Sequence, residues 1–325
     1  MAEQIGNIGV LLPTRGVLVY ANGGRPRVEL NWQMAETAER MGYDSVWIGD
    51  SITSKPRLEP LTTMAALAAR TSRVKIGTAV LLTSLRHPVH LAHAVATIDN
   101  ISNGRVILGV GAGRGDHQMF VQEHACVGIP IKERAARMEE GLNHLRALWT
   151  QDQVTSEGGF YPLDHVALEP KPVQQTVPIW ISSNWVQRGL RRVADQGDAW
   201  ITNVPDVSAF RDCWQKIQER AQEKGRDIRS MPRCLYISVN LNSEEAALQE
   251  GDQFMQAYYG RPYEAISKQL LCVFGPPERC IDAMQKYQQA GANYFIVRFA
   301  SPHQMEQLSK FTQTVLPSLD EIRRY

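Results

Sequence analysis

A run of alternating glycines follows an apolar, β-branched stretch in the first half of the chain. In the segment GRVILGVGAGRGD, glycine occupies positions Gly109, Gly111, Gly113 and Gly115. Glycine-rich turns between a strand and a helix often bind phosphate, because their backbone N–H groups can approach an anion closely. Nucleotide binding is therefore the first chemistry to compare with this spacing.

The spacing matches neither common nucleotide-binding pattern. A dinucleotide fingerprint needs glycines at i, i+2 and i+5. Counting from Gly109, the last position holds Arg114, and counting from Gly111 it holds Asp116. A P-loop ends in Gly-Lys-Ser/Thr, and no such tripeptide follows. The glycines instead indicate a buried strand whose end either permits a bend or close helix packing, or leaves space for a flat ligand against the backbone.

Small or polar side chains also follow three other apolar runs. Their hydroxyl, amide and carboxyl groups can hydrogen-bond a ligand. In a fold whose strands all end on one face, these groups would lie close together on that face. The residues in question are Asp50 and Ser51, then Ser182, Ser183 and Asn184, then Thr202 and Asn203.

The elements that position these residues alternate regularly. Short runs rich in Val, Ile and aromatic residues are separated by amphipathic segments, which is the pattern of buried parallel strands joined by helices. Apolar residues recur at helical spacing in the intervening segments, for example at Ala135, Met138 and Leu142. The expected strands cover residues 5–13, 45–50, 75–82, 105–111, 178–182, 199–202, 234–241 and 294–299.

Eight strand–helix units in 325 residues predict an α/β protein with a (β/α)8 TIM barrel, built as a single domain over residues 1–325. An open doubly wound sheet is the rival fold, but the first strand lacks the glycine fingerprint expected there. Two segments are additions to a minimal barrel. Residues 155–172 predict a small hairpin insertion before strand five, and residues 258–277 predict an enlarged connection between strands seven and eight.

Composition narrows the function classes. The formal net charge is +1, with 35 basic and 34 acidic residues, so we expect neither nucleic-acid nor membrane partners. Five scattered cysteines without a CxxC pair fit a reducing compartment. The N-terminal segment lacks the pattern of a signal peptide, and no apolar run is long enough for a membrane helix. We expect a cytoplasmic protein that acts on a small-molecule substrate.

Four stretches of the chain carry a family resemblance. They read AETAERMGYDSVWIGDS, RTSRVKIGTAVLLTSLRHPVHLAHAVATIDNISNGRVILGVGAG, ERAARMEEGLNHLRALW and PKPVQQTVPIWISSNWVQRGLRRVADQGDAW. Together they resemble the bacterial luciferase-like flavin-dependent oxidoreductases, a group that includes reduced-FMN monooxygenases and coenzyme F420-dependent enzymes. The resemblance runs over nearly the whole chain and implies a homodimer.

The resemblance also implies where a cofactor binds. The ring of the flavin or deazaflavin would lie in the barrel mouth, over a non-proline cis peptide that corresponds to Ala79–Val80, and beside the glycine strand at Gly111, Ala112 and Gly113. The phosphate would bind near the turn and helix after strand five. The residues implied there are Ser182, Ser183, Asn184 and Arg188, whose hydroxyl, amide and guanidinium groups suit an oxyanion.

The implied catalytic positions depart from one branch of the family. F420-dependent dehydrogenases typically have Asp-His after strand two, where this chain has Asp50 and Ser51. Sugar-specific members place a glutamate after the glycine strand, where this chain has Arg114. We expect these three residues to hydrogen-bond the ring or the substrate.

The leading prediction from the sequence is therefore a monooxygenase that uses reduced FMN and O2, with a separate flavin reductase as partner. The alternative is a coenzyme F420-dependent reductase or dehydrogenase, which the modest chain length favours. Two further classes are less favoured. A flavin-binding protein without turnover would follow if the pocket were plugged. A metal-dependent barrel hydrolase would need clustered carboxylates and histidines at strand ends, which the sequence does not show.

Histidines and aromatic residues offer weaker signals. A metal site is not predicted, because the three histidines of RHPVHLAHA are spaced around a helix and Pro88 is expected to open that helix with His87 before it. His117 and His124 are expected to line the pocket, and His165 to be exposed. The aromatic candidates for contact with a ring or substrate are Trp185, Tyr258 and Tyr259.

Overall fold

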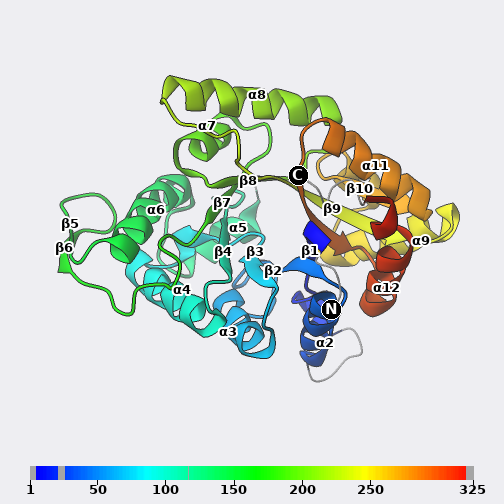
Figure 1. Cartoon of the computed structure of the whole chain (residues 1–325), viewed down its shortest axis with the longest axis horizontal. Helices are drawn as coiled ribbons and strands as arrows, with labels where there is room; N and C mark the ends of the chain where they lie inside the picture. The colour runs from blue at the N-terminus through cyan, green and yellow to red at the C-terminus, as the bar shows by residue number, and fades with distance from the viewer. Residues whose placement is uncertain (1–4, 21–25, 116, 320–325) are drawn as a thin grey trace. The chain divides into compact units, whose positions relative to one another are not determined.

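The structure is a computed structural model that describes residues 5–20, 26–115 and 117–319. Strands and helices alternate along the chain (Figure 1). The strands are β1 (Ile5–Leu11), β2 (Tyr43–Ile48), β3 (Lys75–Thr78), β4 (Val106–Val110), β5 (Val154–Ser156), β6 (Leu163–Val166), β7 (Ile179–Ser182), β8 (Ala199–Thr202), β9 (Arg233–Leu241), β10 (Cys272–Gly275) and β11 (Tyr294–Phe299). Asp116, the last residue of the glycine segment, lies outside the described residues.

Helices connect these strands. No helix of the described residues is both long and apolar enough to cross a membrane. The α-helices are α1 (Gly16–Val19), α2 (Glu29–Arg40), α3 (Pro60–Arg70), α4 (Pro88–Ser102), α5 (Gln118–Ala125), α6 (Arg134–Thr150), α7 (Gln187–Gln196), α8 (Val207–Glu223), α9 (Glu244–Tyr259), α10 (Tyr263–Ser267), α11 (Pro277–Gln289) and α12 (Gln304–Thr314).

The strand order is that of a closed parallel barrel. It runs β9, β11, β1, β2, β3, β4, β7 and β8, and β8 pairs with β9 again. The pairs whose register is given along this order, such as β1 with β11 and β8 with β9, are parallel. The predicted (β/α)8 fold and all eight predicted barrel strands are therefore confirmed.

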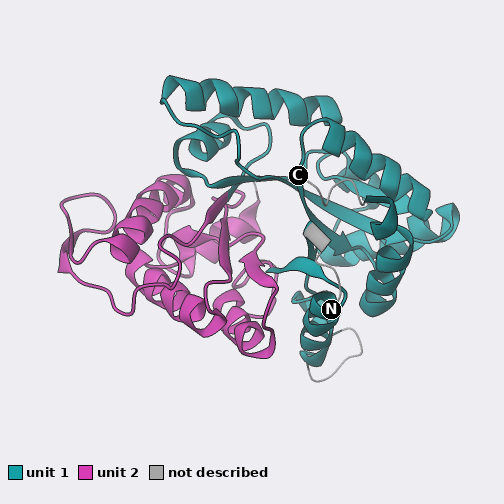
Figure 2. Ribbon diagram, viewed as in Figure 1, with its two compact units in different colours: residues 1–47, 181–325 teal, residues 48–180 magenta. Residues whose placement is uncertain are grey.

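The chain divides into two compact units, coloured separately in Figure 2. Unit 1 comprises Met1–Trp47 and Ile181–Tyr325, and unit 2 comprises Ile48–Trp180. The single domain over residues 1–325 stays a prediction.

Both predicted additions to the minimal barrel are present. In unit 2, β5 and β6 form a two-stranded antiparallel sheet, which confirms the hairpin before the fifth barrel strand. In unit 1, the connection from β9 to β11 contains α9, α10, β10 and α11. The strand β10 was not predicted, because it is a four-residue apolar run with no alternation and pairs only with β9.

The core of unit 1 explains one glycine of the first strand. Trp47 Nε1 donates to Ser45 Oγ (2.6 Å), and Ser45 Oγ also hydrogen-bonds the hydroxyl of Tyr294 (2.7 Å). A Cβ placed on Gly9 would lie 2.1 Å from Ser45 Oγ. Only glycine lets the backbone of β1 approach this buried polar cluster so closely.

The third barrel strand of unit 2 ends earlier than the predicted residue 82. Regular pairing stops at Thr78. Just beyond it, the peptide bond between Ala79 and Val80 is cis. The cis peptide that the resemblance implied is thus confirmed. Pairing with the glycine strand resumes beyond it, where Leu81 N–H donates to the Gly109 carbonyl (2.8 Å) and Gly111 N–H donates to the Leu81 carbonyl (3.0 Å).

Candidate functional site

In unit 2, Asp50 follows β2 and forms a buried ion pair with Arg86. The Asp50 side chain is 0% exposed and that of Arg86 is 15% exposed. Arg86 binds both carboxylate oxygens, with Nη1 at 2.6 Å from Oδ2 and Nη2 at 3.1 Å from Oδ1. Leu82 N–H also donates to Oδ2 (2.9 Å). Asp50 therefore anchors the segment that follows the cis peptide.

The charges around Arg86 hold this arrangement together. Burial lowers the pKa of Arg86, but the hydrogen bonds and charges of Asp50 and Glu59 outweigh burial and raise it. Arg86 Nη2 also lies 3.1 Å from Glu59 Oε1, whose side chain is partly exposed. The two groups thus form a bidentate guanidinium–carboxylate pair, the geometry in which such hydrogen bonds are strongest. A contact between Asp50 and a ring or substrate stays a prediction.

Ser51 is buried and belongs to a loop that surrounds the carboxylate of Glu123. Ser51 Oγ donates to Glu123 Oε1 (2.7 Å), and Ser54 Oγ donates to Oε2 (2.7 Å). The backbone N–H groups of residues 52, 53 and 54 also donate to Oε1, at 2.6, 3.0 and 3.2 Å. One fully buried carboxylate on α5 therefore fixes the loop of residues 51–54.

Glu123 was missed by the sequence analysis. Its only local signal is a carboxylate beside His124 in a helix with few other charges. Its partners lie about 70 residues earlier in the chain, as the separations of 69 to 72 residues show. A single sequence does not reveal such a pairing, whereas the hydroxyl-rich segment SITS at 51–54 does indicate a loop that can bind an oxyanion.

The environment of Glu123 predicts acid sensitivity. Burial raises the pKa of Glu123, but the hydrogen bonds from Ser51, Ser54 and the loop backbone outweigh burial and lower it below the usual 4.5. A depressed folded-state pKa gives stability that is present above the unfolded-state value and is lost as pH falls through the folded-state value. Urea unfolding between about pH 6 and pH 3 should show this loss, and Glu123→Gln should flatten the profile. An unchanged profile in that variant would exclude Glu123 as its source.

Arg57 lies over the carboxyl end of β2 and was also missed. A Cβ on Gly49 would lie 1.9 Å from Arg57 Nη1, so this close approach needs glycine. Arg57 Nε is buried and has no hydrogen-bond partner among the described residues. A guanidinium therefore lies against the backbone just before Asp50.

The glycine segment continues β4 without large side chains until Arg114. Gly111 is buried, Ala112 is half-buried, and Gly113 and Arg114 are exposed. Gly113 has φ +71°, a left-handed conformation that favours glycine, and a Cβ there would lie 3.2 Å from Leu82 Cδ2. The segment thus combines small residues with a backbone turn, as the sequence predicted, while its contact with a ring stays a prediction.

The histidines differ in their roles. His124 is buried, with Nδ1 2.9 Å from the Phe120 carbonyl and Nε2 3.3 Å from Ser84 Oγ. His117 is exposed and caps α5, and its place in a pocket stays a prediction. As predicted, Pro88 is the first residue of α4 and His87 precedes it, capping the helix. His165 is exposed, also as predicted. Among the described residues, no group of three or more His, Cys, Asp or Glu side chains is placed to hold a metal ion.

In unit 1, Asn184 follows β7 and links it to the end of β8. Its Oδ1 accepts from Thr202 Oγ1 (2.9 Å) and from Asn203 N–H (3.3 Å). Its Nδ2 donates to Asn203 Oδ1 (2.8 Å). Three of the polar residues predicted after these two strands, Asn184, Thr202 and Asn203, are therefore joined by hydrogen bonds of the Asn184 side chain.

The turn after Asn184 leads into α7 and leaves the first turn of that helix without a side-chain cap. The capping position is Val186, which makes no such hydrogen bond, and Arg188 is exposed in the first turn. Ser183 is buried beneath this turn, and a Cβ on Gly189 would lie 2.2 Å from its Oγ. Backbone N–H groups at a helix N-terminus, a hydroxyl at Ser182 and the guanidinium of Arg188 are a donor set that suits a phosphate.

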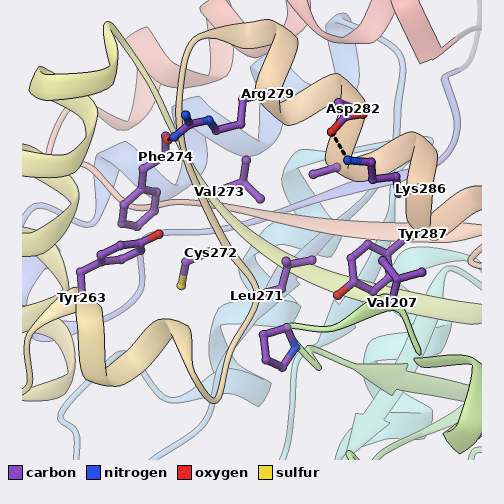
Figure 3. A pocket seen from close by; sticks show the side chains of 12 residues that line it. Val207, Tyr263, Leu271, Cys272, Val273, Phe274, Arg279, Asp282, Lys286 and Tyr287 are labelled. Atoms are coloured by element: carbon purple, nitrogen blue, oxygen red, sulfur yellow. Dashed lines mark hydrogen bonds and ion pairs between the residues drawn. The ribbon is translucent and has the colours of Figure 1, made fainter. Parts of the chain in front are cut away.

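A cavity of about 240 Å³ lies elsewhere in unit 1, beside β10 and α11 (Figure 3). Most of the side chains around it are apolar or aromatic, including Tyr263 and Phe274. Its charged groups already have partners: Lys286 pairs with Asp282 at 2.7 Å, and Arg279 pairs with Glu244 at 2.7 Å. None of the residues predicted for catalysis or cofactor binding lines this cavity.

The sequence model of the luciferase-like monooxygenase family matches residues 7–294. An F420-dependent glucose-6-phosphate dehydrogenase from Amycolatopsis mediterranei (strain U-32) is 29% identical over 318 residues, which covers 88% of this chain and 93% of that protein.

Two solved structures share the fold. An F420-dependent secondary alcohol dehydrogenase in complex with an F420–acetone adduct has a TM-score of 0.78 and 22% identity, covering 98% of this chain and 99% of that one. The monooxygenase RslO1 from Streptomyces bottropensis has a TM-score of 0.78 and 20% identity, covering 96% and 99%. From the match over residues 7–294, the chain belongs to the luciferase-like monooxygenase family, a family of oxidoreductases with the (β/α)8 fold.

Proposed function

We propose that this protein transfers hydride between coenzyme F420 and a small organic substrate. The observation that carries the proposal is the similarity, over 88% of the chain, to an enzyme named as F420-dependent. This reverses the order that we predicted from the sequence, where reduced FMN came first. The reduced-FMN monooxygenase becomes the second candidate, because the monooxygenase structure shares only the fold at 20% identity.

The position after Asp50 narrows the proposed reaction. The dehydrogenases of the family typically have histidine there, whereas this chain has Ser51, whose Oγ already donates to Glu123. A serine in this bonding state supplies no general base near neutral pH. We therefore favour hydride transfer from the reduced deazaflavin to a polarised double bond over oxidation of a sugar or an alcohol.

When bound, F420 supplies the hydride-carrying ring. In unit 2, we propose that the backbone at Ala79–Val80 and the small residues Gly111, Ala112 and Gly113 contact that ring. Arg114 is exposed beyond the glycines, and Arg57 lies against Gly49. We propose that these two guanidinium groups orient oxygen atoms of the ring or the substrate, with Asp50 acting mainly by fixing the loop that follows the cis peptide.

In unit 1, we propose that Ser182, Arg188 and the first turn of α7 bind the cofactor's phosphate. Arg188→Ala should weaken F420 binding about tenfold, because one charge-assisted hydrogen bond contributes about 1.5 kcal/mol. Arg191→Ala, an exposed arginine further along the same helix, is the matched control and should bind F420 as the parent does. Fluorescence titration measures both. Equal affinities for the two variants would place the phosphate elsewhere.

A titration of the apoprotein tests the proposed function itself. F420, oxidised FMN and reduced FMN would each be added while fluorescence is followed, with oxygen uptake measured for the reduced flavin. We expect micromolar affinity for F420 and no oxygen uptake above the rate of free reduced FMN. Tight binding of reduced FMN with indifference to F420 would instead support the monooxygenase, and with it the predicted flavin reductase partner.

A further inference from the structure

The cavity of about 240 Å³ in unit 1 has aromatic side chains at both ends (Figure 3). At one end, the rings of Tyr263 and Phe274 have their centroids 4.8 Å apart and their planes tilted by 34°. At the other end, Tyr287 contributes a third ring. Between the two ends lie Val273 of β10 and Leu271, which directly precedes that strand. A ligand in the cavity would therefore contact aromatic rings on two sides.

The charged side chains at the cavity are matched in pairs. Lys286 and Asp282 form an ion pair one helical turn apart, at 2.7 Å, and both side chains are largely exposed. Arg279 is partly exposed, pairs with Glu244 at 2.7 Å and donates to the Phe274 carbonyl (3.0 Å). Each of these cations at the solvent-facing rim thus has a carboxylate partner. Among the described residues that line the cavity, the charges therefore give no strong preference for an ion.

Two uncharged polar groups also line the cavity. The hydroxyl of Tyr263 is directed into it, and the thiol of Cys272 lies nearby (Figure 3). Burial raises the pKa of both groups, so both keep their protons at neutral pH. The hydroxyl of Tyr287 instead donates to the Val204 carbonyl (2.7 Å). Because a thiol is a weak donor, the Tyr263 hydroxyl is the stronger hydrogen-bond donor directed at a ligand.

The volume of the cavity fits one substituted aromatic ring. A dry apolar cavity of about 150 Å³ can hold a benzene molecule, whereas a single water needs only about 10 to 15 Å³. The cavity of about 240 Å³ thus has room for a ring with a short substituent. A tricyclic cofactor with its side chain is much larger, and none of the residues proposed to contact F420 lines this cavity. The cavity therefore suits a second, smaller ligand.

We propose that this cavity binds a small uncharged molecule that consists of one aromatic ring and a carbonyl group. The ring packs between the Tyr263–Phe274 pair and Tyr287, in the offset or edge-on contacts that aromatic rings prefer. The carbonyl oxygen accepts from the Tyr263 hydroxyl. An ionised group would lose its hydration here without gaining an unmatched opposite charge. This inference goes beyond the proposed hydride transfer and does not depend on the choice between F420 and FMN.

Thermal unfolding of the full-length apoprotein tests the site. Acetophenone is the probe, and sodium benzoate is its charged counterpart of similar size and shape. At ten times its Kd, acetophenone should raise Tm by about 2 °C. Benzoate at the same concentration should raise Tm by much less, because it carries a charge. Equal rises with the two compounds would overturn the assignment to an uncharged ligand.

Variants locate the binding within the cavity. Ala283→Phe adds a ring to the cavity from α11 and should abolish the rise in Tm. Gln285→Phe, at an exposed position of the same helix, should keep it. Tyr263→Phe removes the hydroxyl donor and should raise the Kd for acetophenone about fivefold. Tyr20→Phe, at an exposed tyrosine, should leave the Kd unchanged. Equal Kd values for these two tyrosine variants would contradict the hydrogen bond to the carbonyl.

A second measurement requires no variant to fold. Crystals of the parent protein would be soaked in 4-bromoacetophenone, and an anomalous bromine peak is expected between Tyr263 and Tyr287. The proposal is overturned if acetophenone leaves Tm unchanged, if Ala283→Phe keeps the full rise, or if bromine is found only outside this cavity.

Discussion

Replacement of Glu123 by alanine is expected to lower the free energy of unfolding by about 3–5 kcal/mol. The buried carboxylate accepts hydrogen bonds from two serine hydroxyls and from three consecutive backbone N–H groups. Alanine leaves these donors without an acceptor and removes the link between α5 and the loop of residues 51–54. Urea unfolding of the parent and the variant measures the difference.

A neighbouring residue provides the control. Gln122 is exposed on the same helix, so Gln122→Ala should change stability by less than about 0.5 kcal/mol. Glu123→Gln keeps one oxygen acceptor without the charge, so its free energy of unfolding should lie between those of Glu123→Ala and Gln122→Ala. If Glu123→Ala were as stable as Gln122→Ala, the carboxylate would not be what fixes the loop.

Arg86→Met should be destabilising by a comparable amount, about 3–5 kcal/mol. The change leaves the Asp50 carboxyl, whose side chain is 0% exposed, without its guanidinium partner; of the donors described here, the Leu82 N–H remains. Removing one partner of a buried ion pair costs more than removing both, because an uncompensated charge stays behind. The double variant Asp50→Asn with Arg86→Met should therefore recover part of the loss. Thermal and urea unfolding of the single and double variants give the coupling free energy between Asp50 and Arg86.

The matched comparison is an ion pair on the surface. Arg229 pairs with Asp227 at 2.7 Å, and both side chains are largely exposed. Arg229→Met should leave the midpoint of unfolding nearly unchanged, since solvent screens such pairs. Equal effects of Arg86→Met and Arg229→Met would mean that the Asp50–Arg86 pair does not hold the segment after the cis peptide.

The barrel was predictable because each of its strands is a local pattern. Runs such as residues 105–111 and 294–299 are apolar and β-branched, and glycine or proline separates them from amphipathic segments. Patterns of this kind do not report how a strand ends. The predicted strand 75–82 is interrupted at the cis peptide, and the four residues of β10 are too few to display any period.

The candidate site was predictable in position more than in role. Ser51 and Asn184 do follow strands, yet their polar atoms hydrogen-bond Glu123 and the end of β8. Glu123 was not predicted, because its significance comes from partners about 70 residues earlier in the chain. A sequence shows which side chains can donate or accept, but only the folded chain shows which of them are already paired.

The bonding of Glu123 restricts which side chains position 51 can hold. Histidine at position 51 would remove the hydroxyl donor to Oε1 and place a bulkier ring in a buried position. Ser51→His alone is therefore expected to loosen the loop of residues 51–54, which this hydrogen bond helps to fix. Because the side chains at 51 and 123 share a hydrogen bond, we expect a change at one of these positions to be tolerated best when the other changes with it.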